Sequence, residues 1–80
     1  MHEISLCESI LKILERKAKE EGFSRVVSVQ IAIGEFSGAS QESMEFCFPL
    51  VTKGTLAENA TLDFIPEEGT ALRVKSLEVD

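Results

Sequence analysis

Histidine occurs only once in this chain of 80 residues, at position 2, and tryptophan and tyrosine do not occur at all. A lone histidine leaves no conventional triad around a serine or cysteine nucleophile. The chain also lacks the GxGxxG and GxxxxGK(S/T) loops that hold phosphate groups. The adjacent carboxylates Glu67 and Glu68 fall in a polar turn, where no apolar surroundings adapt them to acid–base chemistry. We therefore expect that the protein is not an enzyme.

Cysteine occurs only at positions 7 and 47, within the apolar segments LCESILKIL and MEFCFPLV. A structural zinc ion needs four ligands, usually from closely spaced pairs, so these two cysteines do not form a zinc site. In a reducing compartment we expect both thiols to be free and buried, rather than joined in a disulfide or reactive. A thiol enzyme that uses Cys7 or Cys47 is an alternative with less support, because no base accompanies either thiol.

Basic residues are scarce as well: 8 Lys and Arg stand against 14 Asp and Glu, for a formal net charge of −6. This charge repels phosphate backbones and anionic lipids, so we expect neither nucleic acid nor membrane as a partner. No apolar run approaches the roughly 20 residues of a membrane-spanning helix. The acidic start MHEISLCESI also does not resemble a secretory signal. These features predict a cytoplasmic protein.

Five segments have the periodicity of regular secondary structure. Apolar residues at steps of three and four predict two helices, the second capped by Ser40, and alternating apolar residues predict three strands. The predicted order is helix, strand, helix, strand, strand, over residues 4–21, 25–34, 41–53, 60–65 and 71–79. This order favours an α+β fold in which a three-stranded sheet is packed on one face by two α-helices. A chain of this length forms one domain, spanning residues 1–80.

Three local features of this prediction can be checked in a structure. In the first strand, Val27, Val29, Ile31 and Ile33 are expected to share one face. The other face carries Val26, Ser28, Gln30 and Ala32, a mixed set that predicts partial cover on both faces. The short turn around residues 66–70 predicts that the last two strands pair as an antiparallel hairpin. The inward phase of the last strand slips near Lys75–Ser76, which predicts either a bulge or a strand that is buried on different faces at its two ends.

Proline inside the second helix is unusual. Pro49 removes one backbone hydrogen bond from the predicted helix over residues 41–53. We therefore expect a kink or an early end of that helix.

The start Met1–His2–Glu3 offers several nitrogen donors in a row. The α-amine of Met1 and the imidazole of His2 both lose their protons near neutral pH. Together with the amide nitrogens of His2 and Glu3 they can form fused chelate rings, and planar nitrogen ligation suits Ni(II) or Cu(II) rather than zinc. The carboxylate of Glu3 can serve as an axial or supporting group. The alternative is a frayed terminus with an exposed imidazole and no metal.

The chain resembles a known family along nearly all of its length. The start MHEISLCESILKILERKA is followed by VSVQIAIGEFSG, MEFCFPLVTKGT, ATLDFIP and finally LRVKSLEVD. In this order the segments resemble the hydrogenase nickel-incorporation metallochaperones, the HypA/HybF family. The MHE start is the most specific part of the resemblance.

The resemblance implies a nickel metallochaperone. It implies that Met1, His2 and Glu3 bind Ni(II) for delivery to the large subunit of a [NiFe] hydrogenase, and in some organisms to urease maturation. It also implies a nickel-handling GTPase as a partner.

One part of the family pattern is missing. Family members carry a small zinc domain with two CxxC pairs between the last two strands, and here the short turn around residues 66–70 stands in its place. We therefore expect a single nickel-binding domain that binds no zinc. Nickel capture at the terminus uses none of the missing residues, so we expect it to be retained.

A metal-free protein–protein interaction domain is the alternative function. The two interpretations differ in one requirement, because only nickel binding needs a free amino terminus. We expect a monomer rather than a dimer, although a short turn at the former domain junction leaves strand exchange between chains open.

Overall fold

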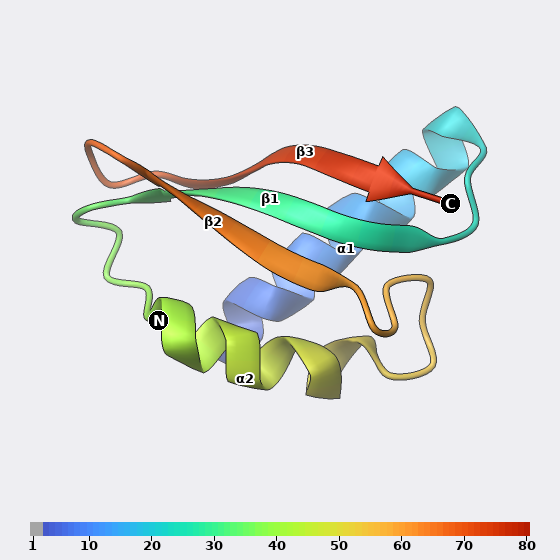
Figure 1. Ribbon diagram of the computed structural model, residues 1–80, viewed down its shortest axis with the longest axis horizontal. Helices are drawn as coiled ribbons and strands as arrows, with labels where there is room; N and C mark the ends of the chain where they lie inside the picture. The colour runs from blue at the N-terminus through green and yellow to red at the C-terminus, as the bar shows by residue number, and fades with distance from the viewer. Residues whose placement is uncertain (1–2) are drawn as a thin grey trace.

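The computed structural model describes residues 3–80, which form two helices and a three-stranded sheet (Figure 1). The predicted element order is confirmed, with boundaries shifted by a few residues. The elements are α1 (Glu3–Glu21), β1 (Val26–Gly34), α2 (Gln41–Thr52), β2 (Thr61–Glu67) and β3 (Leu72–Val79).

Helix α1 forms because its apolar residues lie along one stripe. Cys7, Ile10 and Leu14 are the buried residues of this helix, at steps of three and four. The helix is followed by Gly22, whose φ of +79° and N–H bond to the Ala18 carbonyl (2.8 Å) form a glycine cap. The helix begins at Glu3, one residue earlier than predicted.

The central strand of the sheet is β1, and the strand order is β2-β1-β3. Strand β2 is parallel to β1, whereas β3 is antiparallel to β1 on its other edge. The predicted hairpin between the last two strands is therefore wrong, because β1 lies between them. The unit β1–α2–β2 has the form strand, helix, parallel strand, in which the helix supplies the long crossover that parallel pairing requires.

A short link can still join β2 to β3 over the end of β1. The link has four residues, 68–71, and needs to span two strand spacings, about 10 Å in all, which a nearly extended chain of this length reaches. It closes directly over the end of β1: the N–H of Gly34 donates to the Ala71 carbonyl (2.7 Å), and that of Phe36 donates to the Gly69 carbonyl (2.8 Å). Loop length alone therefore does not identify which strands pair.

Two irregularities set which side chains face the core. The predicted bulge in β3 is confirmed: Gln30 pairs with Ser76 and Ile31 with Val74, so Lys75 is an extra residue. A second irregularity in β1 leaves Val27 without a partner in the register with β3. Val27 therefore does not share the buried face of Val29 and Ile31 as expected, since it is 41% exposed and Val26 is buried.

The core lies between both helices and one face of the sheet. Rows of paired residues cross the sheet on this face, including Leu62–Val29–Leu77 and Phe64–Ile31–Val74. These residues pack in one cluster with Cys7, Ile10 and Leu14 of α1 and with Met44 and Phe48 of α2. On the opposite face, the Ser76 hydroxyl donates to Gln30 (2.6 Å). The α+β fold, with both helices on one face, is confirmed (Figure 1).

Helix α2 begins where predicted and continues past its proline. The Ser40 side chain accepts a hydrogen bond from the Ser43 N–H (3.2 Å), which is the geometry of an N-cap. Pro49 lies inside the helix, which runs three residues further, to Thr52. There the Thr52 hydroxyl donates to the Phe48 carbonyl (2.9 Å). None of the helices within residues 3–80 is long and apolar enough to cross a membrane.

Substituting Gly34 tests the close passage of the link over β1. A Cβ atom at Gly34 would lie 2.6 Å from the Gly69 carbonyl oxygen and 2.7 Å from that of Ala71, both of which belong to the backbone. We expect Gly34→Ala to lower the free energy of unfolding by about 3 kcal/mol in urea denaturation.

The matched control is Gly22→Ala. Gly22 has a φ of +79°, but a Cβ atom at this position would have no other atom within 4 Å, so only backbone strain of about 1 kcal/mol is expected. Equal losses for the two variants would contradict the steric role of Gly34.

Candidate metal centre

The predicted metal site is only partly covered by the structure. Met1 and His2 lie outside the described residues, and Glu3 is the first residue of α1. Within residues 3–80, no group of three or more histidine, cysteine, aspartate or glutamate side chains is arranged to hold a metal ion. The described part of the chain thus offers no competing site of this kind.

The backbone of Glu3 is placed at a helix start. The first four N–H groups of an α-helix have no carbonyl partner within the helix. The amide nitrogen of Glu3 is one of these, because Glu3 is the first residue of α1. Ligation through this nitrogen would therefore break no hydrogen bond of the helix.

The carboxylate of Glu3 joins the starts of both helices. Its Oε2 accepts a hydrogen bond from the backbone N–H of Ser40 (3.2 Å), the residue that caps α2. The positive end of a helix dipole lies at each of these two helix starts, and both favour a carboxylate there. Glu3 thus fixes the beginning of α1 against the beginning of α2.

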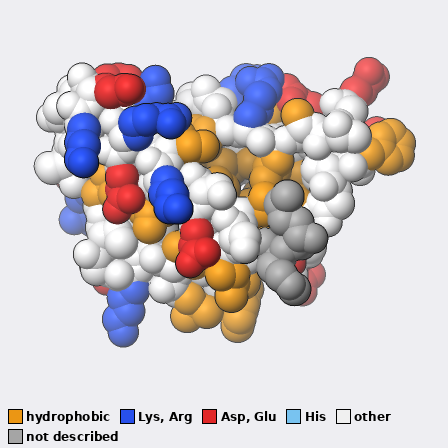
Figure 2. Space-filling model, turned by 180° about the vertical axis from the view of Figure 1, so that it is seen from behind, with side chains coloured by type: hydrophobic (Ala, Val, Ile, Leu, Met, Phe, Trp, Pro, Cys, Tyr) orange, Lys and Arg blue, Asp and Glu red, His pale blue; other side chains and the backbone are white. Residues whose placement is uncertain are grey.

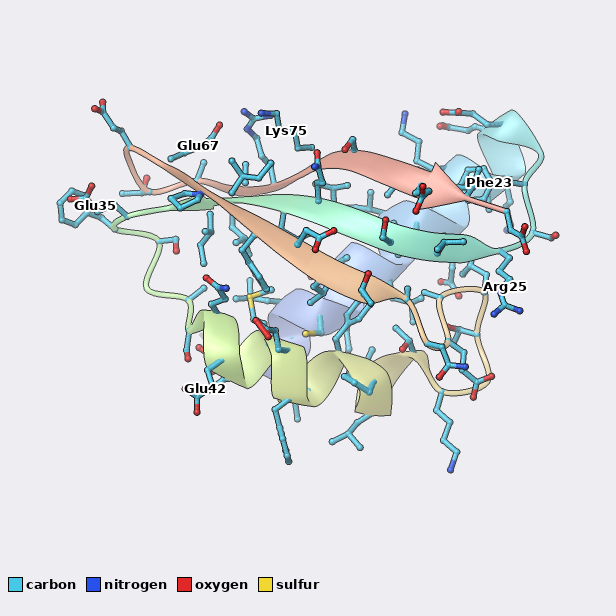
Figure 3. The ribbon with its side chains drawn as sticks, viewed as in Figure 1. Phe23, Arg25, Glu35, Glu42, Glu67 and Lys75 are labelled. Atoms are coloured by element: carbon cyan, nitrogen blue, oxygen red, sulfur yellow. The ribbon has the colours of Figure 1, made fainter. Side chains whose placement is uncertain are left out.

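A shallow hollow opens beside this contact, between the two helix starts. It is lined by Glu3, Ile4, Ser5, Glu42, Ser43, Phe46 and Cys47. Its rim is acidic and apolar: Glu42 points away from the sheet in Figure 3, and the Phe46 side chain is 74% exposed. Apolar side chains also gather at the lower edge of the molecule in Figure 2, the edge along which α2 lies in Figure 1. Carboxylates around the start of α1 attract cations rather than anions.

The two thiols are free, as predicted, but they differ in exposure. Cys7 is buried, and its Sγ donates to the Met44 carbonyl across the helix interface (3.6 Å). Burial, with smaller contributions from Cys47 and Glu3, raises the pKa of the Cys7 thiol to about 11. Cys47 is only half-buried, so the expectation that both are buried is wrong for this residue, which lies at the edge of the helix interface. A protonated, buried Cys7 is no activated nucleophile.

The contact between Glu3 and Ser40 is the site feature that sequence reasoning missed. The two residues are 37 positions apart, and their meeting depends on how α1 packs against α2. The sequence does show both halves of the contact separately, an acidic residue at one helix start and a serine cap at the other.

Removing the Glu3 carboxylate tests its role as a connection between the helices. We expect Glu3→Ala to lower the free energy of unfolding by about 1 kcal/mol, because one charge-assisted hydrogen bond and two favourable helix-dipole interactions are lost. Glu3→Gln keeps an acceptor oxygen, so its free energy of unfolding should lie between those of the wild type and of Glu3→Ala. Glu8→Ala, at an exposed position of the same helix, is the control and should change little. Equal effects at positions 3 and 8 would contradict the connection.

Comparison of the sequence with known proteins assigns the chain to a family. Residues 1–72 match the sequence model described as hydrogenase/urease nickel incorporation, metallochaperone, hypA. The hydrogenase maturation factor HypA of Xanthobacter autotrophicus is 46% identical over 71 residues, which are 89% of this chain and 63% of that protein. The HypA of Paracoccus denitrificans is 43% identical over 72 residues, 90% of this chain and 64% of that protein. The chain thus spans less than two thirds of the length of these relatives.

Comparison of the fold with solved structures also finds HypA proteins. The solution structure of the nickel metallochaperone HypA from Helicobacter pylori superimposes with a TM-score of 0.85 and 20% identity, covering 99% of this chain and 97% of that one. A second solution structure of a HypA protein superimposes with a TM-score of 0.80. At this identity the structures support the fold alone, whereas the sequence matches identify the family. The chain belongs to the HypA family of hydrogenase/urease nickel-incorporation metallochaperones.

Proposed function

We propose that this chain binds Ni(II) at its amino terminus and delivers it to [NiFe] hydrogenase during the maturation of that enzyme. Following the family description, we propose the same role in urease maturation. The ligands are nitrogens of Met1, His2 and Glu3. The observation that carries the proposal is the position of Glu3 as the first residue of α1, within a family match that begins at residue 1.

A helix start at Glu3 suits this binding mode. Amide nitrogens ligate a metal only after they lose a proton, so an amide that already serves a helix hydrogen bond would be a costly donor. The Glu3 amide lies in the first turn, where that cost does not arise. Planar nitrogen ligation suits Ni(II), and the same donors favour Cu(II) even more, so Cu(II) should compete.

The carboxylate of Glu3 acts as a support in this proposal. Its Oε2 is engaged by the Ser40 N–H, which orients the residue that follows His2. Outer groups of this kind hold the ligands in place and typically change metal affinity by about ten- to a hundredfold. Glu3→Ala should therefore weaken nickel binding less than the loss of a nitrogen ligand.

The domain organisation is part of the same proposal. Residues 1–80 form one nickel-binding domain, and the link over residues 68–71 stands where family members carry their zinc domain. The sequence match to the Xanthobacter autotrophicus relative supports this proposal, because it covers 89% of this chain but only 63% of that protein. We propose that the chain binds no zinc, because it contains no CxxC pair.

Delivery requires partners. We propose that the monomer works with a nickel-handling GTPase and with the hydrogenase large subunit. Two exposed apolar residues line the hollow with Glu3, and their side chains are 50% (Ile4) and 74% (Phe46) exposed. The same observation favours the alternative function, a protein–protein interaction domain without metal, because exposed apolar side chains grouped together mark contact surfaces.

Substituting His2 separates the two functions. In calorimetric titration of the untagged protein with Ni(II) near neutral pH, His2→Ala should bind more than about a hundredfold more weakly, because it loses an imidazole ligand. Its circular dichroism spectrum and its urea midpoint should match those of the wild type. Glu8→Ala is the control and should bind nickel normally.

A blocked terminus gives the second arm of this test. Acetylation of the Met1 α-amine removes this nitrogen as a donor without creating another free amine, and should also abolish tight binding. Tight binding that persists in both variants would show that the nickel site lies elsewhere. If the wild type itself binds only weakly, the metal-free interaction domain is the better description.

A further inference from the structure

The two thiols of the chain meet at the interface of the two helices. Cys7 lies on the buried stripe of α1, and its Sγ is 3.6 Å from the carbonyl oxygen of Met44 in α2. In an α-helix the carbonyl of one residue points toward the amide four positions later, and so lies beside the residues three and four positions on. The carbonyl of Met44 therefore lies beside Cys47 and Phe48, which brings the sulfur of Cys7 next to Cys47.

Two further observations agree with this placement. Cys47 packs against the same buried cluster that contains Cys7. Cys47 is also close enough to Cys7 to help raise the pKa of its thiol. At the same time Cys47 lines the surface hollow beside Glu3, so it can be reached from solvent, whereas Cys7 is buried.

We propose that Cys7 and Cys47 form a reversible dithiol that a hydroperoxide oxidises to an intramolecular disulfide between α1 and α2. The site differs from the proposed nickel clip in its residues and in its chemistry, and it does not depend on metal binding. Neither the family description nor the relatives' names assign a role to these thiols.

The exposures of the two thiols set the order of events. The thiolate of Cys47 attacks one oxygen of the hydroperoxide, an S–O bond forms, the O–O bond breaks, and the second oxygen leaves as water or an alcohol after taking a proton. The sulfur of Cys7 then loses its proton and attacks the sulfur of Cys47, so that an S–S bond forms and the sulfenic oxygen leaves as water. Overall, two thiols are oxidised to a disulfide, and one hydroperoxide is reduced to water and either water or an alcohol.

The surroundings restrain the first step without preventing it. Cys47 is only half-buried, so a hydroperoxide can reach its sulfur, but less readily than it reaches a fully exposed thiol. We therefore expect oxidation by stoichiometric hydroperoxide over minutes to hours, not rapid turnover, which is consistent with a modification site rather than an enzyme.

The test is mass spectrometry of the metal-free, reduced full chain after treatment with hydrogen peroxide in the presence of a chelator. We expect a monomer that has lost two hydrogen atoms, a cross-linked peptide pair containing Cys7 and Cys47, and full recovery after dithiothreitol. A disulfide-linked dimer, a stable sulfinic acid on Cys47 with Cys7 still free, or two unmodified thiols would each overturn the proposal.

Two single variants test the order of attack. In Cys7→Ala, Cys47 should still be oxidised and should be trapped as a sulfenic acid by dimedone, without a cross-link. In Cys47→Ala, peroxide should oxidise the buried Cys7 at least about tenfold more slowly than it oxidises Cys47 in Cys7→Ala. Equal reactivity in the two variants would overturn the assigned order. The wild-type cross-link decides the main proposal even if a variant fails to fold.

Discussion

The central strand β1 has to satisfy hydrogen-bonding partners on both of its edges, and most of the structure follows from that requirement. Helix α2 carries the chain back so that β2 can pair in parallel on one edge, and β3 returns antiparallel on the other. The link between β2 and β3 must then pass over the end of β1, which leaves room only for a glycine at position 34. On the inward face of the same strand, Val29 and Ile31 provide the buried surface against which both helices pack.

This arrangement also places the start of α1. Since α1 and α2 pack together over one face of the sheet, the start of α1 lies against the cap of α2, where the Glu3 carboxylate accepts the Ser40 N–H. The segment proposed to bind nickel therefore includes the first residue of a helix, Glu3, which contacts the cap of the second helix. Acidic side chains and exposed apolar side chains surround this point, a combination that suits both a cation and a protein partner.

Much of this fold could be predicted from local patterns, and the exceptions have physical causes. The helix stripe of Cys7, Ile10 and Leu14, the Ser40 cap and the bulge at Lys75 are all visible in residue spacing. The strand order is not visible in the length of the link at residues 68–71, although the sequence of strand, helix and strand from β1 to β2 does favour parallel neighbours. The burial of Val26 in place of Val27 could not be predicted, because both are valines and only the irregular pairing with β3 selects one of them.

The candidate metal site, like the fold, can be predicted only in part from the sequence. The nitrogens of Met1, His2 and Glu3 that we propose as nickel ligands are apparent in the sequence, whereas the contact between Glu3 and Ser40 depends on packing between residues far apart in the chain. The most direct test of nickel ligation at the amino terminus is a proton–nitrogen NMR spectrum of the nickel-loaded, untagged protein. Amide ligation in a planar, diamagnetic site predicts that the backbone N–H signal of Glu3 disappears, while signals from the later turns of α1 remain sharp. A Glu3 N–H signal that persists in the saturated complex would contradict the account.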